Sequence, residues 1–163
     1  MTREEILRTL RATAKTAMDL GAGLLPGQMT RRARDDEWSM VEILQHLIRG
    51  EREVVLPRLR RMLVEDGPVF VSSSASRTGF AAPPQSGDWS AALAAFRRVR
   101  ADTLTFLDAL AEAHWERKGT TPTCGTLTIE EYARYLAEHD LEHLAQMETT
   151  RAAVTGAPVP QRV

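Results

Sequence analysis

Four long segments with helical periodicity constrain the fold of this 163-residue chain more than any other feature of its sequence. In each segment apolar residues recur three and four positions apart, which places them on one face of an α-helix. No stretch sustains the alternation of apolar and polar residues that a half-buried β-strand requires. Each segment runs for about 20 residues or more, or about 30 Å of helix. The pattern predicts an all-α protein, a four-helix bundle packed along amphipathic faces.

Three of the four segments begin with a capping box. In this motif a Ser or Thr side chain accepts from the third helical backbone N–H, and a Glu at that position reaches back to the cap. The pairs are Thr2 with Glu5, Ser39 with Glu42, and Thr128 with Glu131. We expect the remaining helix, third in chain order, to start near Asp88 and to fade between His114 and Lys118.

The second segment and the connection after it carry the strongest helix-breaking residues. Pro57 lies inside the second segment, where its ring clashes with the preceding turn and predicts a kink. Residues 65–87 have no period and are rich in Pro, Gly, Ser and Ala, so we expect a long flexible loop rather than a crossover or a lid. We expect one domain over residues 1–163, with residues 157–163 as a tail.

Charge and cysteine content narrow the classes of function. The 21 basic and 22 acidic residues give a net charge of -1, which argues against a nucleic-acid partner. No apolar run approaches the roughly 20 residues that cross a bilayer, and the charged N-terminal segment does not resemble a secretory signal. Cys124 is the single cysteine, which excludes an internal disulfide and favours the reducing cytoplasm. We expect its thiol to be inert.

His139 and His143 form the sharpest chemical pattern. A spacing of four residues places both imidazoles on one helix face, where they can share a metal ion. Tyr132 and Leu136 occupy the same sector, so the imidazoles face inward. Asp140 replaces the Glu of the His-Glu-x-x-His zinc motif, and we do not expect it to act as a general base. The alternative is that the two histidines are ordinary surface residues, or core residues whose polar atoms are satisfied.

His46, on the second segment, is the candidate for a third ligand. In an up-and-down bundle helices two and four run parallel, and His46 and His139 would lie about 9 Å and 15 Å from their helix starts. A side chain can bridge that difference of one turn. Three imidazoles would leave coordination positions open for water and substrate. Against this, His46 lies just outside the apolar arc from Ile43 to Leu59. The residues alone therefore do not distinguish a three-histidine metal site from histidines that bind no metal.

Glu51 lies in the middle of the apolar arc of the second segment. A lone buried carboxylate is costly, so we expect an Arg partner from another helix. The alternatives are that Glu51 accepts from an imidazole N–H or acts as the catalytic acid or base. Gln146 and Arg151 are candidates to bind an anionic group of a substrate or cofactor. Trp38 is expected to pack between helices.

Two blocks of the sequence resemble the DinB/YfiT-like superfamily. Residues 38–47, Trp-Ser-Met-Val-Glu-Ile-Leu-Gln-His-Leu, resemble its second-helix motif. Residues 125–129, followed by His139-x-x-x-His143-x-x-Gln146, resemble its last-helix motif. The resemblance implies a four-helix bundle of unusual-handed up-and-down topology. It also implies a divalent metal ion (Zn, Ni, Mn or Fe) held by His46, His139 and His143, and a homodimer.

Some members of that superfamily are transferases or isomerases that use a low-molecular-weight thiol. We therefore expect a metal-dependent enzyme acting on a small molecule: a thiol-dependent S-transferase, or a related isomerase or hydrolase. Three neutral imidazoles leave the charge of the ion in place, so it can activate a water or a thiol. The alternative is a non-catalytic metal-binding or stress-responsive bundle. A DNA-damage-linked nucleic-acid binder conflicts with the charge balance.

Overall fold

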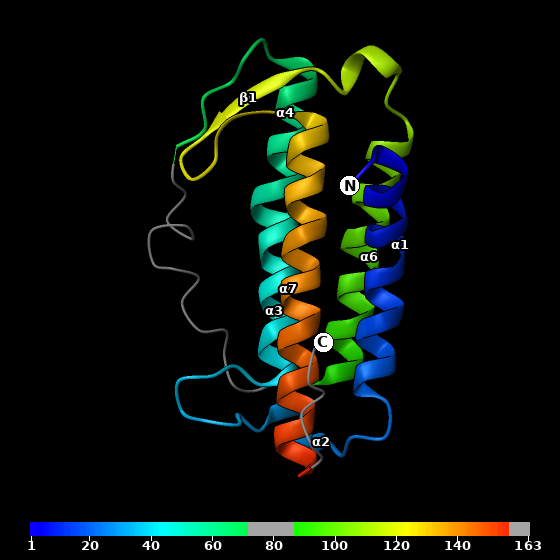
Figure 1. Ribbon diagram of the computed structural model, residues 1–163, viewed down its shortest axis with the longest axis vertical. Helices are drawn as coiled ribbons and strands as arrows, with labels where there is room; N and C mark the ends of the chain where they lie inside the picture. Colours follow the sequence, from blue (N-terminus) through cyan, green and yellow to red (C-terminus); the bar gives the residue numbers. More distant parts are fainter. Residues whose placement is uncertain (72–86, 157–163) are drawn as a thin grey trace.

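Four long helices form a bundle in the computed structural model, which describes residues 1–71 and 87–156 (Figure 1). The four-helix bundle predicted from the sequence is confirmed. The long elements are α1 (Arg3–Gly21), α3 (Met40–Gly50) with its continuation α4 (Leu56–Val64), α6 (Trp89–Asp108) and α7 (Ile129–Thr155). The short elements are α2 (Pro26–Thr30), the 3-10 turn η2 (Glu112–His114), and the strands β1 (Lys118–Thr121) and β2 (Gly125–Thr128).

The predicted helix starts are confirmed, because each rests on a local cap. Both halves of the capping box are present at the starts of α1, α3 and α7. At the start of α6 the Asp88 carboxylate accepts from the backbone N–H groups of Ser90 and Ala91. The predicted end of this helix is wrong: α6 stops at Asp108, before the expected fading near His114.

The disturbance predicted at Pro57 takes the form of a π-helical turn, η1 (Glu51–Val55), between α3 and α4. Here the backbone N–H of Leu56 donates to the carbonyl of Glu51, five residues back instead of four. Proline has no N–H and crowds the carbonyl four residues earlier, and the wider turn accommodates both effects. The second helix therefore continues through the proline.

Helix directions differ from the expectation. Helix α1 lies alongside α7 and runs parallel to it. Thr13 of α1 donates a hydrogen bond to Asp140 of α7, and Figure 1 shows both helices running downward. The bond from Arg58 to Tyr132 pairs α4 with the start of α7, so helices two and four are antiparallel and the expected parallel course is wrong. Helix α4 ends at one end of the bundle and α6 begins at the other, so α6 runs parallel to α3. The predicted flexible loop falls mainly on residues 72–86, outside the described residues.

A small β-hairpin at one end of the bundle was not predicted. Strands β1 and β2 pair antiparallel, and the Phe70 N–H donates to the Thr120 carbonyl at 2.8 Å. Each strand has four residues, rich in Thr and Gly, which is too short to show alternation. Gly125 closes the turn with φ 70°, a conformation that glycine adopts without strain. Figure 1 shows the hairpin lying across the ends of α4 and α7.

Two apolar clusters fill the bundle, one above the other, and a layer of four buried polar residues separates them. Each long helix contributes one residue to this polar layer: Thr13, Glu51, Arg100 and Asp140. In every long helix, the apolar residues that precede the polar residue belong to one cluster, and those that follow it belong to the other. Among the described helices, none combines the length and apolar character needed to cross a membrane.

Candidate metal centre

Three histidine rings from two helices converge at mid-height in the bundle. His46 projects from α3, and His139 and His143 project from successive turns of α7. The Nε2 atom of His139 lies 3.2 Å from Nε2 of His46 and 3.2 Å from Nε2 of His143. Nitrogens bound at about 2.0–2.1 Å to a tetrahedral ion are about 3.3 Å apart. The structure thus brings the three predicted histidines together at distances that suit one metal ion.

Gln146 orients one of these rings. Its Oε1 atom lies 2.8 Å from Nδ1 of His143. An amide oxygen can only accept, so the proton of the neutral imidazole is assigned to Nδ1, which leaves Nε2 as a lone-pair donor facing the other rings. Gln146 was expected to hold an anionic group, and in the structure it contacts the ring of His143 instead.

Burial favours the uncharged form of two of the rings, those of His46 and His139. The pKa of His46 is lowered to about 3, chiefly by removal from water, and the neighbouring His143 and His139 contribute in the same direction. Burial also lowers the pKa of His139, with His143 contributing in the same direction. An imidazole binds a metal ion only in its unprotonated form. Both rings are therefore ready to bind metal at neutral pH without first losing a proton.

Aromatic side chains line the approach to the histidines. The Trp38 ring centroid lies 4.8 Å from that of His46 and 6.1 Å from that of His143. Tyr135 lies 6.1 Å from His139 by the same measure. Trp38 was expected to pack between helices, and its ring also packs against the candidate ligands. Tyr135 was missed, although its position one turn before His139 places it on the same helix face.

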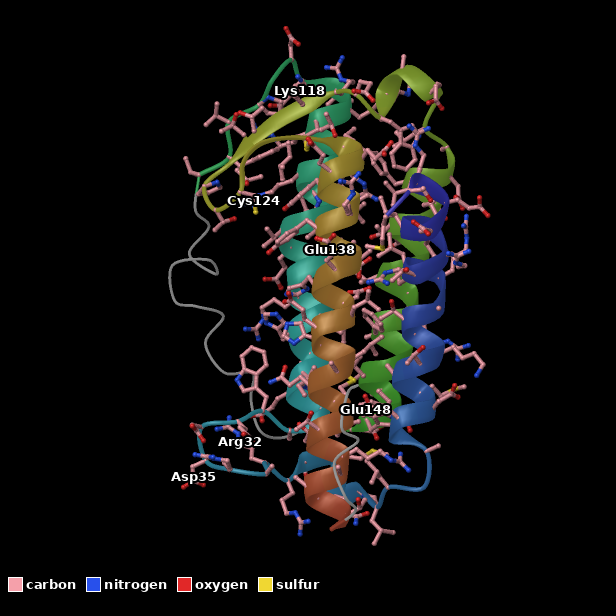
Figure 2. The ribbon with its side chains drawn as sticks, viewed as in Figure 1. Arg32, Asp35, Lys118, Cys124, Glu138 and Glu148 are labelled. Atoms are coloured by element: carbon pink, nitrogen blue, oxygen red, sulfur yellow. The ribbon has the colours of Figure 1, made fainter. Side chains whose placement is uncertain are left out.

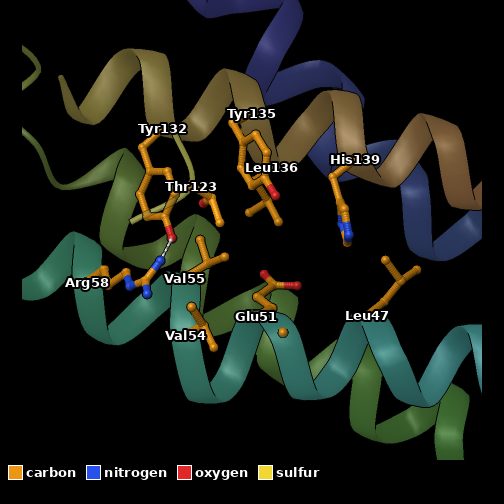
Figure 3. Close-up of a pocket in the computed structure, with 11 residues that line it drawn as sticks. Leu47, Glu51, Val54, Val55, Arg58, Thr123, Tyr132, Tyr135, Leu136 and His139 are labelled. Carbon is orange, nitrogen blue, oxygen red and sulfur yellow. Dashed lines mark hydrogen bonds between the residues drawn. The ribbon is translucent and has the colours of Figure 1, made fainter. Parts of the chain in front are cut away.

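A cavity of about 140 Å³ opens beside His139 (Figure 3). Its walls are mainly apolar and aromatic, and the charged side chains in them are Glu51 and Arg58. The lining comes from α3, η1, α4, α7 and the hairpin turn: Leu47, Gly50, Glu51, Val54, Val55, Arg58, Thr123, Tyr132, Tyr135, Leu136 and His139. The arrangement suits a small, largely apolar molecule that reaches the histidines.

The expected Arg partner of Glu51 is confirmed. Arg100 of α6 donates from Nε and Nη2 to the two carboxylate oxygens of Glu51, each at 2.9 Å, and both residues are buried. Arg100 also donates to Oδ2 of Asp140 at 2.7 Å. Burial by itself lowers the pKa of Arg100, but Asp140 and Glu51 outweigh it and raise that pKa above its usual value. The π-helical turn places Glu51 so that its carboxylate faces both Arg100 and the cavity.

The comparisons with known proteins agree with this architecture. A model of the DinB superfamily matches residues 3–147. The chain belongs to the DinB superfamily. The fold is similar to that of YfiT from Bacillus subtilis, described as a probable metal-dependent hydrolase with an unusual four-helix bundle topology. That likeness has a TM-score of 0.80 and 17% identity, and covers 96% of this chain and 89% of that one. No curated protein matches the sequence.

Two other residues of this DinB-superfamily chain lie apart from the histidines. Arg151 was expected to bind an anionic group, but its guanidinium donates to the carbonyls of Leu20 and Ala22 at the end of α1. It therefore caps a helix and does not line the cavity. Cys124 lies in the hairpin turn, where its Sγ is 3.5 Å from the hydroxyl of Thr123 (Figure 2).

Proposed function

We propose that this protein is a metal-dependent hydrolase of small molecules, in which His46, His139 and His143 hold a divalent cation (Zn, Ni, Mn or Fe). The observation that carries the proposal is the convergence of the three Nε2 atoms beside a cavity. A structural metal site is usually closed by four protein ligands, whereas a catalytic site keeps a position open. Within the described residues, the group capable of holding a metal ion has three members.

The surrounding residues fit such an ion. When bound, the cation supplies Lewis acidity that makes a water or a thiol nucleophilic near neutral pH. Gln146 fixes the orientation of His143, and loss of such a partner typically weakens metal binding. The Trp38 ring packs against one side of the histidines, next to His46 and His143.

Glu51 is our candidate for the group that takes a proton from the attacking water. Its carboxylate and the His139 ring both line the cavity, Glu51 from η1 and His139 from the facing helix α7. Each carboxylate oxygen has a further lone pair beyond the one that Arg100 uses. The bidentate contact with Arg100 holds the carboxylate in one orientation, as proton transfer requires.

S-transfer with a low-molecular-weight thiol is the second candidate, favoured by the resemblance of the two helix motifs to a superfamily that contains such enzymes. It uses the same histidines, with a thiol as the nucleophile. Homodimer formation and a cytoplasmic location stay predictions.

Metal analysis of His139→Ala tests the proposal. We expect wild-type protein, purified without chelator or His-rich tag, to bind about one divalent ion per chain, and His139→Ala to lose it. The matched control is His114→Ala, at the histidine in η2, which should keep the ion. Equal metal content in the two variants would overturn the assignment.

Activity then separates the two reactions. A panel of 4-nitrophenyl esters and thioesters is assayed with the metal-loaded protein, with and without added thiol. Turnover with water alone supports hydrolysis, and turnover that requires thiol supports S-transfer. A metal-loaded protein that turns over no member of either panel favours the non-catalytic alternative.

A further inference from the structure

The end of the cavity remote from the histidines carries an arginine. Arg58 lies in the first turn of α4, and its Nη1 donates to the Tyr132 hydroxyl at 3.2 Å (Figure 3). Its guanidinium also lies 5.3 Å from the centre of the Phe70 ring. The side chain is thus placed at the cavity wall by two neutral aromatic groups.

Arg58 differs from its charged neighbours in having no carboxylate partner within the part of the chain that the structure describes. Glu51, the other charged residue of the cavity wall, pairs with Arg100 through both carboxylate oxygens. Along the same helix, Arg61 pairs with Glu65. The sequence of residues 72–86 contains no Asp or Glu. The charge of Arg58 is therefore not balanced by an ion pair in this region.

Arg58 and Tyr132 both line the cavity, and each keeps donors that their mutual hydrogen bond does not use. A guanidinium has five N–H donors, and the bond to Tyr132 uses one of them. The Tyr132 hydroxyl accepts from Arg58, so its own O–H remains available to donate. Burial raises the pKa of Tyr132, partly offset by Arg58, so the phenol keeps its proton at neutral pH. Arginine with a neighbouring hydroxyl suits an anionic oxygen group.

The spacing along α7 sets the length of ligand that would fit. Tyr132 and His139 are seven residues apart, which is about 10 Å along a helix axis. Between them the cavity is lined by apolar side chains, among them Val54, Val55 and Leu136. A molecule with its reacting group at the histidines would lay an apolar body along these side chains and end at Arg58.

We propose that Arg58 and the Tyr132 hydroxyl form an anion subsite, which selects small apolar substrates that carry a carboxylate about 10 Å from the reacting bond. This inference rests on the proposed function for the position of the reacting bond, but the subsite itself requires no metal. A phosphate or sulfonate presents the same oxygen chemistry.

Binding of 4-phenylbutyrate, compared with the neutral 4-phenylbutyramide, tests the subsite by isothermal titration calorimetry. The full-length protein is used as purified and again after a chelator has removed metal. We expect the acid to bind about 10- to 100-fold more tightly than the amide in both preparations, as a charge-assisted contact requires. Arg58→Met should abolish this preference, and Arg58→Lys should retain part of it.

The matched control is Arg61→Met, because Arg61 lies on the same helix and over the same Phe70 ring but is paired with Glu65. It should keep the preference for the acid. Equal binding of acid and amide by the wild-type protein, or equal loss in the two Met variants, overturns the subsite. The comparison of acid and amide binding by the wild-type protein needs no variant, so it tests the subsite even where Arg58→Met fails to fold. Failure of the proposed function would instead appear as unchanged metal content in His139→Ala.

Discussion

In an Arg100→Met variant, the carboxylates of Glu51 and Asp140 would remain in the middle of the bundle without their cation. The wild-type Arg100 side chain is 3% exposed, and its guanidinium makes four hydrogen bonds. Two go to Glu51, one to Asp140 and one to the carbonyl of Leu10, at 2.7–2.9 Å. These residues belong to the polar layer between the two apolar clusters, to which all four long helices contribute. Loss of the Arg100 hydrogen bonds would therefore weaken the contacts among all four helices.

The expected loss in the free energy of unfolding is about 3–5 kcal/mol. Breaking a buried ion pair by removing one partner costs that much, since the remaining charge stays buried. In the unfolded chain the guanidinium is hydrated by water instead. Its hydrogen bonds in the folded protein therefore make only a limited net contribution to the free energy of unfolding. Two carboxylates are orphaned rather than one, which places the estimate toward the upper end. Domains of this kind are stable by about 5–15 kcal/mol, so the variant would be close to unfolding.

Urea unfolding followed by circular dichroism measures this loss. With a slope of about 2 kcal/mol per molar urea, the midpoint at pH 7 should fall by about 2 M. The control is Arg97→Met, an exposed position on the same helix, which should change stability by less than about 0.5 kcal/mol. Near pH 4 the difference between the variants should shrink, because protonation removes the unpaired negative charges.

Two results would refute this reasoning. One is a difference below about 1 kcal/mol between the Met variants at pH 7, and the other is a difference that does not shrink on acidification. If Arg100→Met does not fold, the triple variant with Leu at Glu51, Arg100 and Asp140 decides the question. It should be more stable than Arg100→Met, since no unpaired charge remains. Failure of the triple variant to exceed it would also count against the reasoning.

Two further predictions concern metal affinity and acid stability. Gln146→Leu should weaken zinc binding about 10- to 100-fold in a competition titration, whereas Gln146→Glu, which keeps an acceptor oxygen for His143, should not. Burial by itself raises the pKa of Glu42, but hydrogen bonds from Arg32 and Ser39 outweigh it and lower that pKa below its ordinary 4.5. A lowered pKa contributes stability that is present above about pH 4.5 and is lost as pH falls through the folded-state value. Glu42→Gln should therefore be about 1–2 kcal/mol less stable than wild type in urea at pH 7, and the gap should narrow as the pH is lowered below about 4.5. A constant gap across that range would contradict the assignment.

The local signals in the sequence gave the helix starts and the candidate ligands. Capping boxes and apolar periodicity act within one or two turns, so they can be read without knowing the fold. The spacing of His139 and His143 is local in the same sense. The end of α6 was misplaced, and the hairpin was missed, because residues 109–128 carry short elements with little periodicity. The burial of Glu51 implied an Arg partner, but nothing in the sequence pointed to Arg100 among 19 arginines.

The sequence by itself determined a bundle of four amphipathic helices with a histidine pair on the last one, because caps and periodicity are properties of neighbouring residues. Only the tertiary structure decided that α3 runs antiparallel to α7. His46 therefore reaches His139 and His143 from a helix that runs antiparallel to theirs, whereas a parallel helix was expected. Arg100 of α6 reaches Glu51 across the middle of the bundle. These contacts join residues 49 or more positions apart. They depend on how the connection between α4 and α6 sets helix direction, and no local pattern records that choice.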